Sequence, residues 1–217
     1  MQTRGNSDQT PAQAYMDSDG APTPKGQRTR ARILASARRN LEECGYFDAT
    51  VTEITAGSEV ALGTFYRYFN NKEDAFMVLL EHLVIELHDS ASGSWKADDP
   101  LGGLEEATRR YLTAYRKNRQ LVAALLQMSV AVPECAEKWA ELRQMTYERM
   151  ARHLPETIDG HDAYLAISSL ADMVEQFAHR WYVATPVKGR RVPSIDRAAG
   201  TLALIWYRAL YVDGGDT

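Results

Sequence analysis

The chain contains little cysteine, and its thiols are not arranged to bind a metal. Only Cys44 and Cys135 occur in 217 residues, with no CxxC pair and no histidine at metal-ligand spacing. Small core side chains in a reduced, cytoplasmic protein are the simplest interpretation, and a redox-sensing thiol is the alternative. The sequence therefore predicts no metal and no cofactor.

Long apolar runs and catalytic patterns are also missing. The longest uncharged apolar run, residues 121–132, is far shorter than the ~20 residues that span a bilayer, so it predicts a buried helix. The five histidines are scattered without a nucleophile–base pattern, and no glycine-rich phosphate loop occurs. Asp172 and Glu175 fit either a cation or amine site inside a helical bundle or a solvated helix face. We expect no enzyme.

Acidic residues are absent from residues 25–39, which hold six Lys or Arg. The whole chain has a net charge of −4, and residues 75–217 hold 16 Lys or Arg against 19 Asp or Glu. A polyanion such as DNA would therefore be attracted to the N-terminal region and not to the remainder.

Alternating strand patterns are absent, whereas apolar residues recur at helical spacing from Thr29 onward. This pattern predicts an all-α protein of about nine helices. Residues 1–24 are rich in Gln, Ser, Thr, Asp, Gly and Pro and show no periodicity, which predicts a disordered tail. The segment 25–32 is a candidate arm that orders on DNA.

The most informative segment is Thr50–Lys72, TVTEITAGSEVALGTFYRYFNNK. Thr50 and Glu53 have the spacing of a capping box at the start of a first helix. Gly57–Glu59 supply a turn, and Val60 begins a second helix. A helix-turn-helix has this form, with a bracing helix followed by a short helix that enters the major groove. The residues predicted to face the bases are Leu62, Gly63, Thr64 and Arg67.

The same region resembles the TetR family of bacterial transcriptional regulators. The matching features are Arg32-Ile33-Leu34-Ala35-Ser36-Ala37, Gly45-Tyr46, Thr50-Val51-Thr52, Ile54-Thr55, Gly63-Thr64-Phe65-Tyr66-Arg67-Tyr68-Phe69 and Lys72. The resemblance implies phosphate contacts from Thr50, Tyr66, Tyr68 and Lys72. Ser58 and Glu59 depart from the family, which usually has Ala and Gly there, and glutamate is penalised at positive φ.

The resemblance also implies two domains. Residues 25–72 would form a three-helix DNA-binding domain, and residues 73–217 a six-helix domain for effector binding and dimerisation. The family arranges five helices around an effector pocket, and Met and aromatic residues on these helices suit an apolar ligand. Each could equally be an ordinary core residue. The candidates are Tyr111, Tyr115, Leu125, Met128, Trp139, Leu142, Thr146, Met173, Phe177 and Trp181.

The C-terminal part resembles, more weakly, the actinobacterial subgroup that includes the ethionamide-resistance repressor. The residues that carry this likeness are LALIWYRALY near the C-terminus and Ala136-Glu137-Lys138-Trp139. The pocket of that subgroup is a long apolar tunnel, which the resemblance extends to this chain as an expectation.

The last helix is apolar around most of its circumference from Leu202 to Val212, which predicts a partner outside its own domain. The resemblance likewise implies a homodimer formed through the final two helices. The alternative is that Trp206 and its neighbours fill a large core within one chain. The predicted interface residues are Ile167, Val174, Leu202, Ile205, Trp206 and Ala209.

Together these observations predict a homodimeric DNA-binding transcriptional regulator. In this hypothesis a repressor leaves its double-stranded operator when an apolar small molecule binds, without membrane involvement. Two alternatives stay open. One is an activator or ligand-independent DNA binder, and the other is a helical small-molecule-binding protein or enzyme whose DNA-reading region is degenerate.

Overall fold

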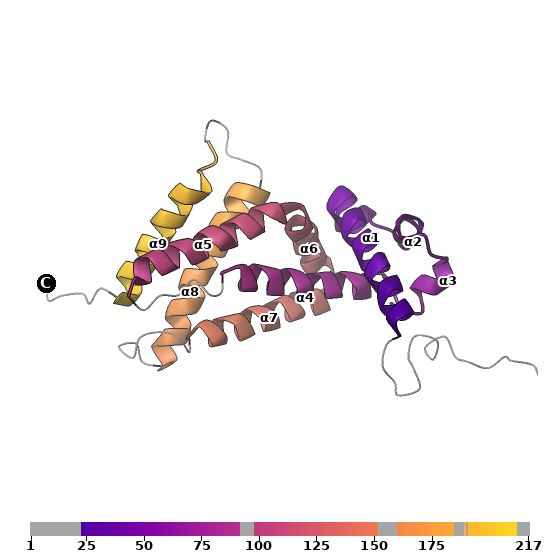
Figure 1. Cartoon of the computed structure of the whole chain (residues 1–217), viewed down its shortest axis with the longest axis horizontal. Coiled ribbons are helices and arrows are strands. Elements are labelled where there is room, and N and C mark those ends of the chain that lie inside the picture. Colours follow the sequence, from indigo (N-terminus) through magenta and orange to yellow (C-terminus); the bar gives the residue numbers. More distant parts are fainter. Residues whose placement is uncertain (1–22, 92–97, 152–159, 185–188, 190, 212–217) are drawn as a thin grey trace, which may run out of the picture. The chain divides into compact units, whose positions relative to one another are not determined.

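The computed structural model describes residues 23–91, 98–151, 160–184, 189 and 191–211. Within these ranges every regular element is a helix, which confirms the all-α prediction (Figure 1). The predicted disordered tail lies outside the described residues except for its last two positions. The helices are α1 Pro24–Asp48, α2 Val51–Ser58, α3 Leu62–Phe65, α4 Lys72–Ala91, α5 Pro100–Lys117, α6 Arg119–Ala131, α7 Pro133–Ala151, α8 Gly160–Ala178, a π-helical turn His179–Val183 and α9 Ile195–Tyr211.

Two compact units make up the chain. The N-terminal unit extends to Leu79 and the C-terminal unit begins at Leu80, so the boundary falls within α4. The N-terminal unit therefore contains α1, α2, α3 and the first turns of α4.

Polar caps and glycine set the helix ends of the N-terminal unit. Pro24 opens α1, where its missing N–H is harmless, and the Thr23 hydroxyl accepts a hydrogen bond from the Gly26 amide. The helix is broken at Gly45, whose φ of 79° costs a glycine little. Thr50 caps α2 as predicted, because its hydroxyl accepts the Glu53 amide at 3.2 Å. Segment 25–32, the candidate DNA arm, lies within α1.

The core of this unit is closed. Ile33, Leu41, Ile54 and Phe65, from α1, α2 and α3, have no exposed surface, and Phe76 of α4 is equally buried. The helix α1 packs against α2, and α2 packs against α3. These contacts fix α3, which has only four residues and could not persist alone.

The C-terminal unit is a helical bundle in which α5 and α9 lie side by side, and α7 packs against both α6 and α8 (Figure 1). Asp99 caps α5 by accepting the Gly102 amide at 2.9 Å. Arg109 links α5 to α9 through a 2.9 Å ion pair with Asp196. No described helix is long and apolar enough to cross a membrane.

Two helix boundaries differ from the prediction. The second helix of the motif begins at Leu62, not Val60, because Glu59 is left-handed and Ala61 is extended. The long helix expected to reach Trp181 ends at Ala178 and continues as the π-helical turn, in which Tyr182 is buried.

Candidate DNA-reading surface and effector cavity

The short helix α3 has one buried face and one exposed face. Phe65 is fully buried and Phe69, just beyond the helix, is 5% exposed. Leu62 and Tyr66 are 51% and 53% exposed, and Arg67 is also exposed. Leu62 of the helix, and Tyr66 and Arg67 directly after it, therefore form a solvent-exposed surface on the side opposite Phe65.

Gly63 lies on the exposed face without an internal reason to be glycine. A Cβ atom built there would meet no heavy atom of the protein within 4 Å, and its φ is not positive. Alanine would also be the better helix former by about 1 kcal/mol. The absence of a side chain therefore keeps the surface of α3 open to close approach from outside.

The turn between α2 and α3 tolerates Glu59 in the left-handed region, with φ 53° and ψ 44°. Two arginines of α1 stabilise this helix end. Arg32 donates to the carbonyl oxygens of Ser58 and Glu59 at 2.7 and 3.1 Å, and Arg39 donates to that of Gly57 at 2.9 Å. The cations satisfy carbonyl groups that a helix C-terminus leaves unpaired.

The basic stretch of α1 is therefore largely engaged within the unit. Besides Arg32 and Arg39, Arg38 pairs with Glu42, and the Arg30 guanidinium lies 5.3 Å from the centre of the Phe69 ring. Three exposed cations of the N-terminal unit make no side-chain ion pair or hydrogen bond with the described residues. They are Lys25, Arg28 and Arg67.

Lys72 has a different setting from the one predicted. Its ammonium donates to the carbonyl oxygens of Tyr46 and Ala49 at 3.0 and 2.9 Å and lies 4.7 Å from the centre of the Tyr46 ring. These carbonyls end α1, so the charge stabilises that helix end. The Lys72 ammonium is thus engaged within the N-terminal unit, and its predicted phosphate contact stays a prediction. Of the other predicted phosphate contacts, Thr50 is exposed and Tyr68 half-buried.

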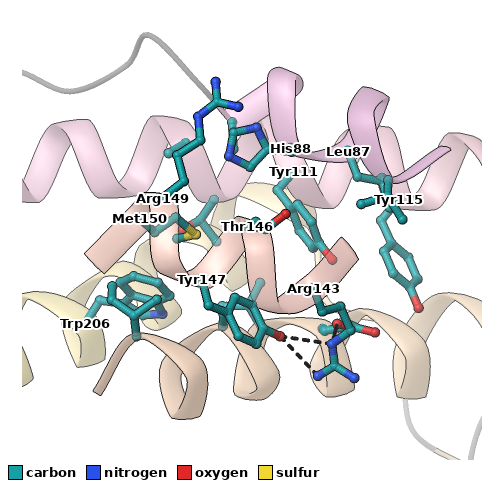
Figure 2. Close-up of a pocket in the computed structure, with 18 of the residues that line it drawn as sticks. Leu87, His88, Tyr111, Tyr115, Arg143, Thr146, Tyr147, Arg149, Met150 and Trp206 are labelled. Carbon is teal, nitrogen blue, oxygen red and sulfur yellow. Dashed lines mark hydrogen bonds and ion pairs between the residues drawn. The ribbon is translucent and has the colours of Figure 1, made fainter. Parts of the chain in front are cut away.

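The C-terminal unit contains a cavity of about 540 Å³ (Figure 2). Its lining comes from α4 to α9 and is mostly apolar. Four of the ten residues predicted for an effector pocket line it: Tyr111, Tyr115, Trp139 and Thr146.

The other six predicted pocket residues do not line this cavity. Leu125 and Met128 are fully buried in the core of the unit. On α8 the cavity-facing residues include Ala171 and Val174, and at about 100° per residue Met173 and Phe177 fall on a different side of the helix. Phe177 instead contacts the rings of Trp181 and Tyr182. Leu142 and Trp181 also lie outside the lining.

Polar residues that the pocket prediction did not include line the cavity as well. They are His88, Arg143, Tyr147, Arg149 and Glu175. Arg143 and Tyr147 follow Trp139 at intervals of four along α7, so helical spacing from Trp139 would have identified them.

Arg143 is the centre of a polar group in the wall. It donates to the Tyr147 hydroxyl and to Asp172, and its Nε lies 3.4 Å from a carboxylate oxygen of Glu175. Burial alone would lower the pKa of Arg143, but Glu175, Tyr147 and Asp172 raise it above its ordinary value. Burial raises the pKa of Glu175, and Arg143 opposes this shift. Burial also raises the pKa of Tyr115.

Four of the six predicted dimer residues are buried within the protomer. Ile167, Val174 and Trp206 line the cavity, and Leu202 is 4% exposed. This burial favours the alternative in which these residues fill the core of one chain, because α9 buries its Leu202–Trp206–Leu210 stripe inside its own unit. The dimer interface itself stays a prediction. Ile205 and Ala209 remain exposed. Other exposed apolar residues on α8 and α9 are Leu165 and Leu204.

The possible metal ligands and the two thiols were the remaining candidate sites in the described residues. No group of three or more His, Cys, Asp and Glu residues is placed there to hold a metal ion. Cys135 is buried, as the core interpretation predicts, whereas Cys44 is exposed and its thiol donates to the Asn40 carbonyl.

The comparisons with known proteins agree with this architecture. Residues 33–76 match the model of the bacterial regulatory proteins of the tetR family. The HTH-type transcriptional regulator EthR of Mycolicibacterium smegmatis is 25% identical over 200 residues, which cover 87% of this chain and 88% of EthR. A tetR-family regulator from Streptomyces coelicolor has the same fold, with a TM-score of 0.69 at 18% identity, covering 84% of this chain and 80% of that one.

Residues 33–76 are a TetR-family DNA-binding domain. This match confirms the resemblance to the TetR family seen between Arg32 and Lys72. The match to EthR over most of the chain agrees with the weaker C-terminal resemblance. TetR-family proteins are DNA-binding transcriptional regulators that act as dimers on operators. The helix-turn-helix of this domain is formed by α2 and α3.

Proposed function

We propose that this TetR-family protein is a homodimeric repressor that releases its operator when a largely apolar small molecule enters the cavity. The observation that carries the proposal is the exposed surface formed by α3 and the two residues that follow it. Leu62, Gly63, Tyr66 and Arg67 lie in solvent while Phe65 anchors the helix from behind. A recognition helix needs this division between reading and anchoring residues.

In this proposal the bases are read by the exposed face of α3. The Thr64 side chain, half-buried, offers a hydroxyl to a base edge or a methyl group to thymine, and Gly63 lets the helix approach closely. Lys25, Arg28 and Arg67, together with the hydroxyls of Thr50, Tyr66 and Tyr68, contact phosphates. Lys72 acts indirectly, by holding the end of α1. Binding should therefore weaken steeply as salt rises.

The dimer in this proposal uses the exposed side of α8 and α9. Leu165, Leu204 and Ile205 are 52%, 39% and 43% exposed. A second copy that covered them would bury these side chains and present two recognition helices about one DNA turn apart, ~34–36 Å. The protein would act in the cytoplasm, where it meets chromosomal DNA.

The effector site in this proposal is the cavity of the C-terminal unit. Each buried CH₂ group of a ligand contributes about 0.8 kcal/mol, so an apolar body gains affinity from area alone. A ligand weakens operator binding only by its differential affinity for the two states of the repressor. The chain offers one direct link, because α4 carries the cavity residues Val84 and Leu87 and begins at Lys72 of the N-terminal unit.

Selection of genomic fragments on the purified protein, followed by footprinting, tests the DNA-binding part. We expect a protected, near-palindromic site, and Thr64→Ala should change base preference at defined positions. Glu148→Gln, at an exposed position of α7, is the control and should leave the footprint unchanged. No protected site would favour a small-molecule-binding protein with a degenerate reading region. A site that no apolar compound releases would favour a ligand-independent DNA binder.

A further inference from the structure

The cavity has a polar end with its own chemistry. Figure 2 shows the hydroxyl of Tyr111 directed toward the side where Arg143 lies, with His88 and Arg149 on the opposite side. Glu175 and Arg143 both act electrostatically on the phenols of Tyr111 and Tyr115. An otherwise apolar cavity with one group of convergent polar side chains selects the head group of its ligand.

The charges at this end do not cancel. Asp172 accepts hydrogen bonds from the Arg143 guanidinium and, at 2.6 Å, from the Tyr147 hydroxyl. Glu175 is left with a single 3.4 Å ion pair to Arg143 and no hydrogen bond among the described residues. Of the two carboxylates that pair with Arg143, only Glu175 lines the cavity. Because Arg143 is shared with Asp172, Glu175 is incompletely neutralised.

The Glu175 side chain is also largely buried. Its side chain is 18% exposed, and burial raises the pKa of the carboxyl against the opposing effect of Arg143. A buried carboxylate without a full set of donors is costly, and a donor on a ligand would relieve that cost.

Tyrosine rings surround the same end. Tyr115 is 3% exposed, lines the cavity, and its hydroxyl has no hydrogen-bond partner in the described part of the chain. The Tyr111 and Tyr115 rings lie 5.9 Å apart. Ring faces of this kind attract cations, and more strongly when water is excluded.

We propose that this end of the cavity binds a protonated amine, with Glu175 as its counter-ion and the rings of Tyr111 and Tyr115 beside it. The apolar body of the ligand then lies against the aliphatic lining, including Val84, Leu87 and Ala171. At this end an anionic head would be repelled by Glu175, and a neutral apolar head would leave Glu175 without a donor. The proposal specifies the effector class of the function proposed above and rests on it.

Three ligands with the same ten-carbon chain test the head group: decylamine, decanol and decanoate. Calorimetry and thermal shift on the full-length protein should give tightest binding for decylamine and weakest for decanoate. Glu175→Gln keeps the side-chain volume and should weaken decylamine binding by about tenfold while leaving decanol binding unchanged. The matched control Glu148→Gln, an exposed glutamate outside the cavity, should change neither value.

Tyr115→Phe provides a second variant, which removes only the unpartnered hydroxyl. It should retain the preference for the amine, because the ring and Glu175 remain. Equal binding of decylamine and decanol, or a preference for decanoate, would overturn the amine proposal and leave the apolar effector site standing. Failure of all three ligands to bind would overturn both.

Discussion

The interior of the N-terminal unit is closed, whereas that of the C-terminal unit is hollow. In the first, Ile33, Leu41, Ile54 and Phe65 have no exposed surface and together anchor a four-residue helix. In the second, helices of 13 to 20 residues line a cavity of about 540 Å³. A DNA-reading surface requires one fixed geometry, and a ligand site requires room. The two interiors should therefore respond to mutation in different ways.

The largest effect is expected at Phe65. Truncation by Phe65→Ala removes a fully buried ring and should destabilise the N-terminal unit by about 3–5 kcal/mol. Urea unfolding followed by circular dichroism measures this loss, and DNA binding should be lost with it. The neighbouring Tyr66→Ala, at a side chain 53% exposed, should change stability by no more than about 0.5 kcal/mol yet weaken DNA binding. Similar stability losses for both variants would show that α3 is not divided into anchoring and reading faces.

Enlarging a small residue should distinguish the two interiors most directly. Ala37→Leu in the closed unit overfills a site with no exposed surface and should cost about 1–3 kcal/mol. Ala171→Leu places the same extra carbons into the cavity, where there is space for them, and should be neutral or stabilising. Thermal unfolding of the pair gives the comparison. A comparable loss at Ala171 would mean that the cavity is not open to ligands.

Two glycines of the N-terminal unit differ in the space available for an added methyl group. A Cβ atom at Gly57 would lie 2.5 Å from the Ser36 hydroxyl oxygen, whereas one at Gly63 would meet nothing within 4 Å. Gly57→Ala should therefore destabilise the packing of α1 on α2, by about 1 kcal/mol if Ser36 moves aside. Gly63→Ala should keep or raise Tm, because alanine favours the helix, and should weaken operator binding. Unchanged operator affinity in Gly63→Ala would place the DNA contact elsewhere.

Glu59 should give the smallest effect. Glu59→Gly relieves a left-handed residue and should stabilise the N-terminal unit by up to about 1 kcal/mol. Chemical denaturation measures this gain, with Glu43→Gly as a control at an exposed position within helix α1, where glycine should destabilise. A loss of stability in Glu59→Gly would mean that the glutamate side chain contributes more than its backbone strain costs.

The closed unit could be predicted from sequence almost residue by residue. Its signals are local: the Thr50 cap, the break at Gly45 and the Phe65 anchor each follow from residues a few positions away. Lys72 is the exception, because its partners Tyr46 and Ala49 lie more than 20 residues earlier and only the folded chain brings them together. The predicted domain boundaries at Lys72 and Glu73 remain a prediction, although the compact units divide slightly later, at Leu79.

The hollow unit was harder to predict because a cavity wall and a core use the same residues. Aromatic and Met content identified Tyr111, Tyr115 and Trp139 correctly as lining residues but also selected Met128, which is fully buried in the core. An apolar stripe such as that of Trp206 looks the same whether it faces a cavity or a second copy. The rotation of α8 and α9 decides the matter, and sequence periodicity alone does not fix it.

The most direct test of the account is the operator affinity of the full-length protein with and without a ligand in the cavity. Fluorescence anisotropy on a footprinted operator fragment, with decylamine as the ligand, measures both states. We expect decylamine to weaken operator binding by about tenfold or more for the wild type, within the usual range of allosteric coupling. For Glu175→Gln, about ten times more decylamine should be needed for the same release. Unchanged operator affinity while calorimetry shows decylamine bound, or the same dependence of release on decylamine concentration in Glu175→Gln, would contradict the coupling of this cavity to DNA.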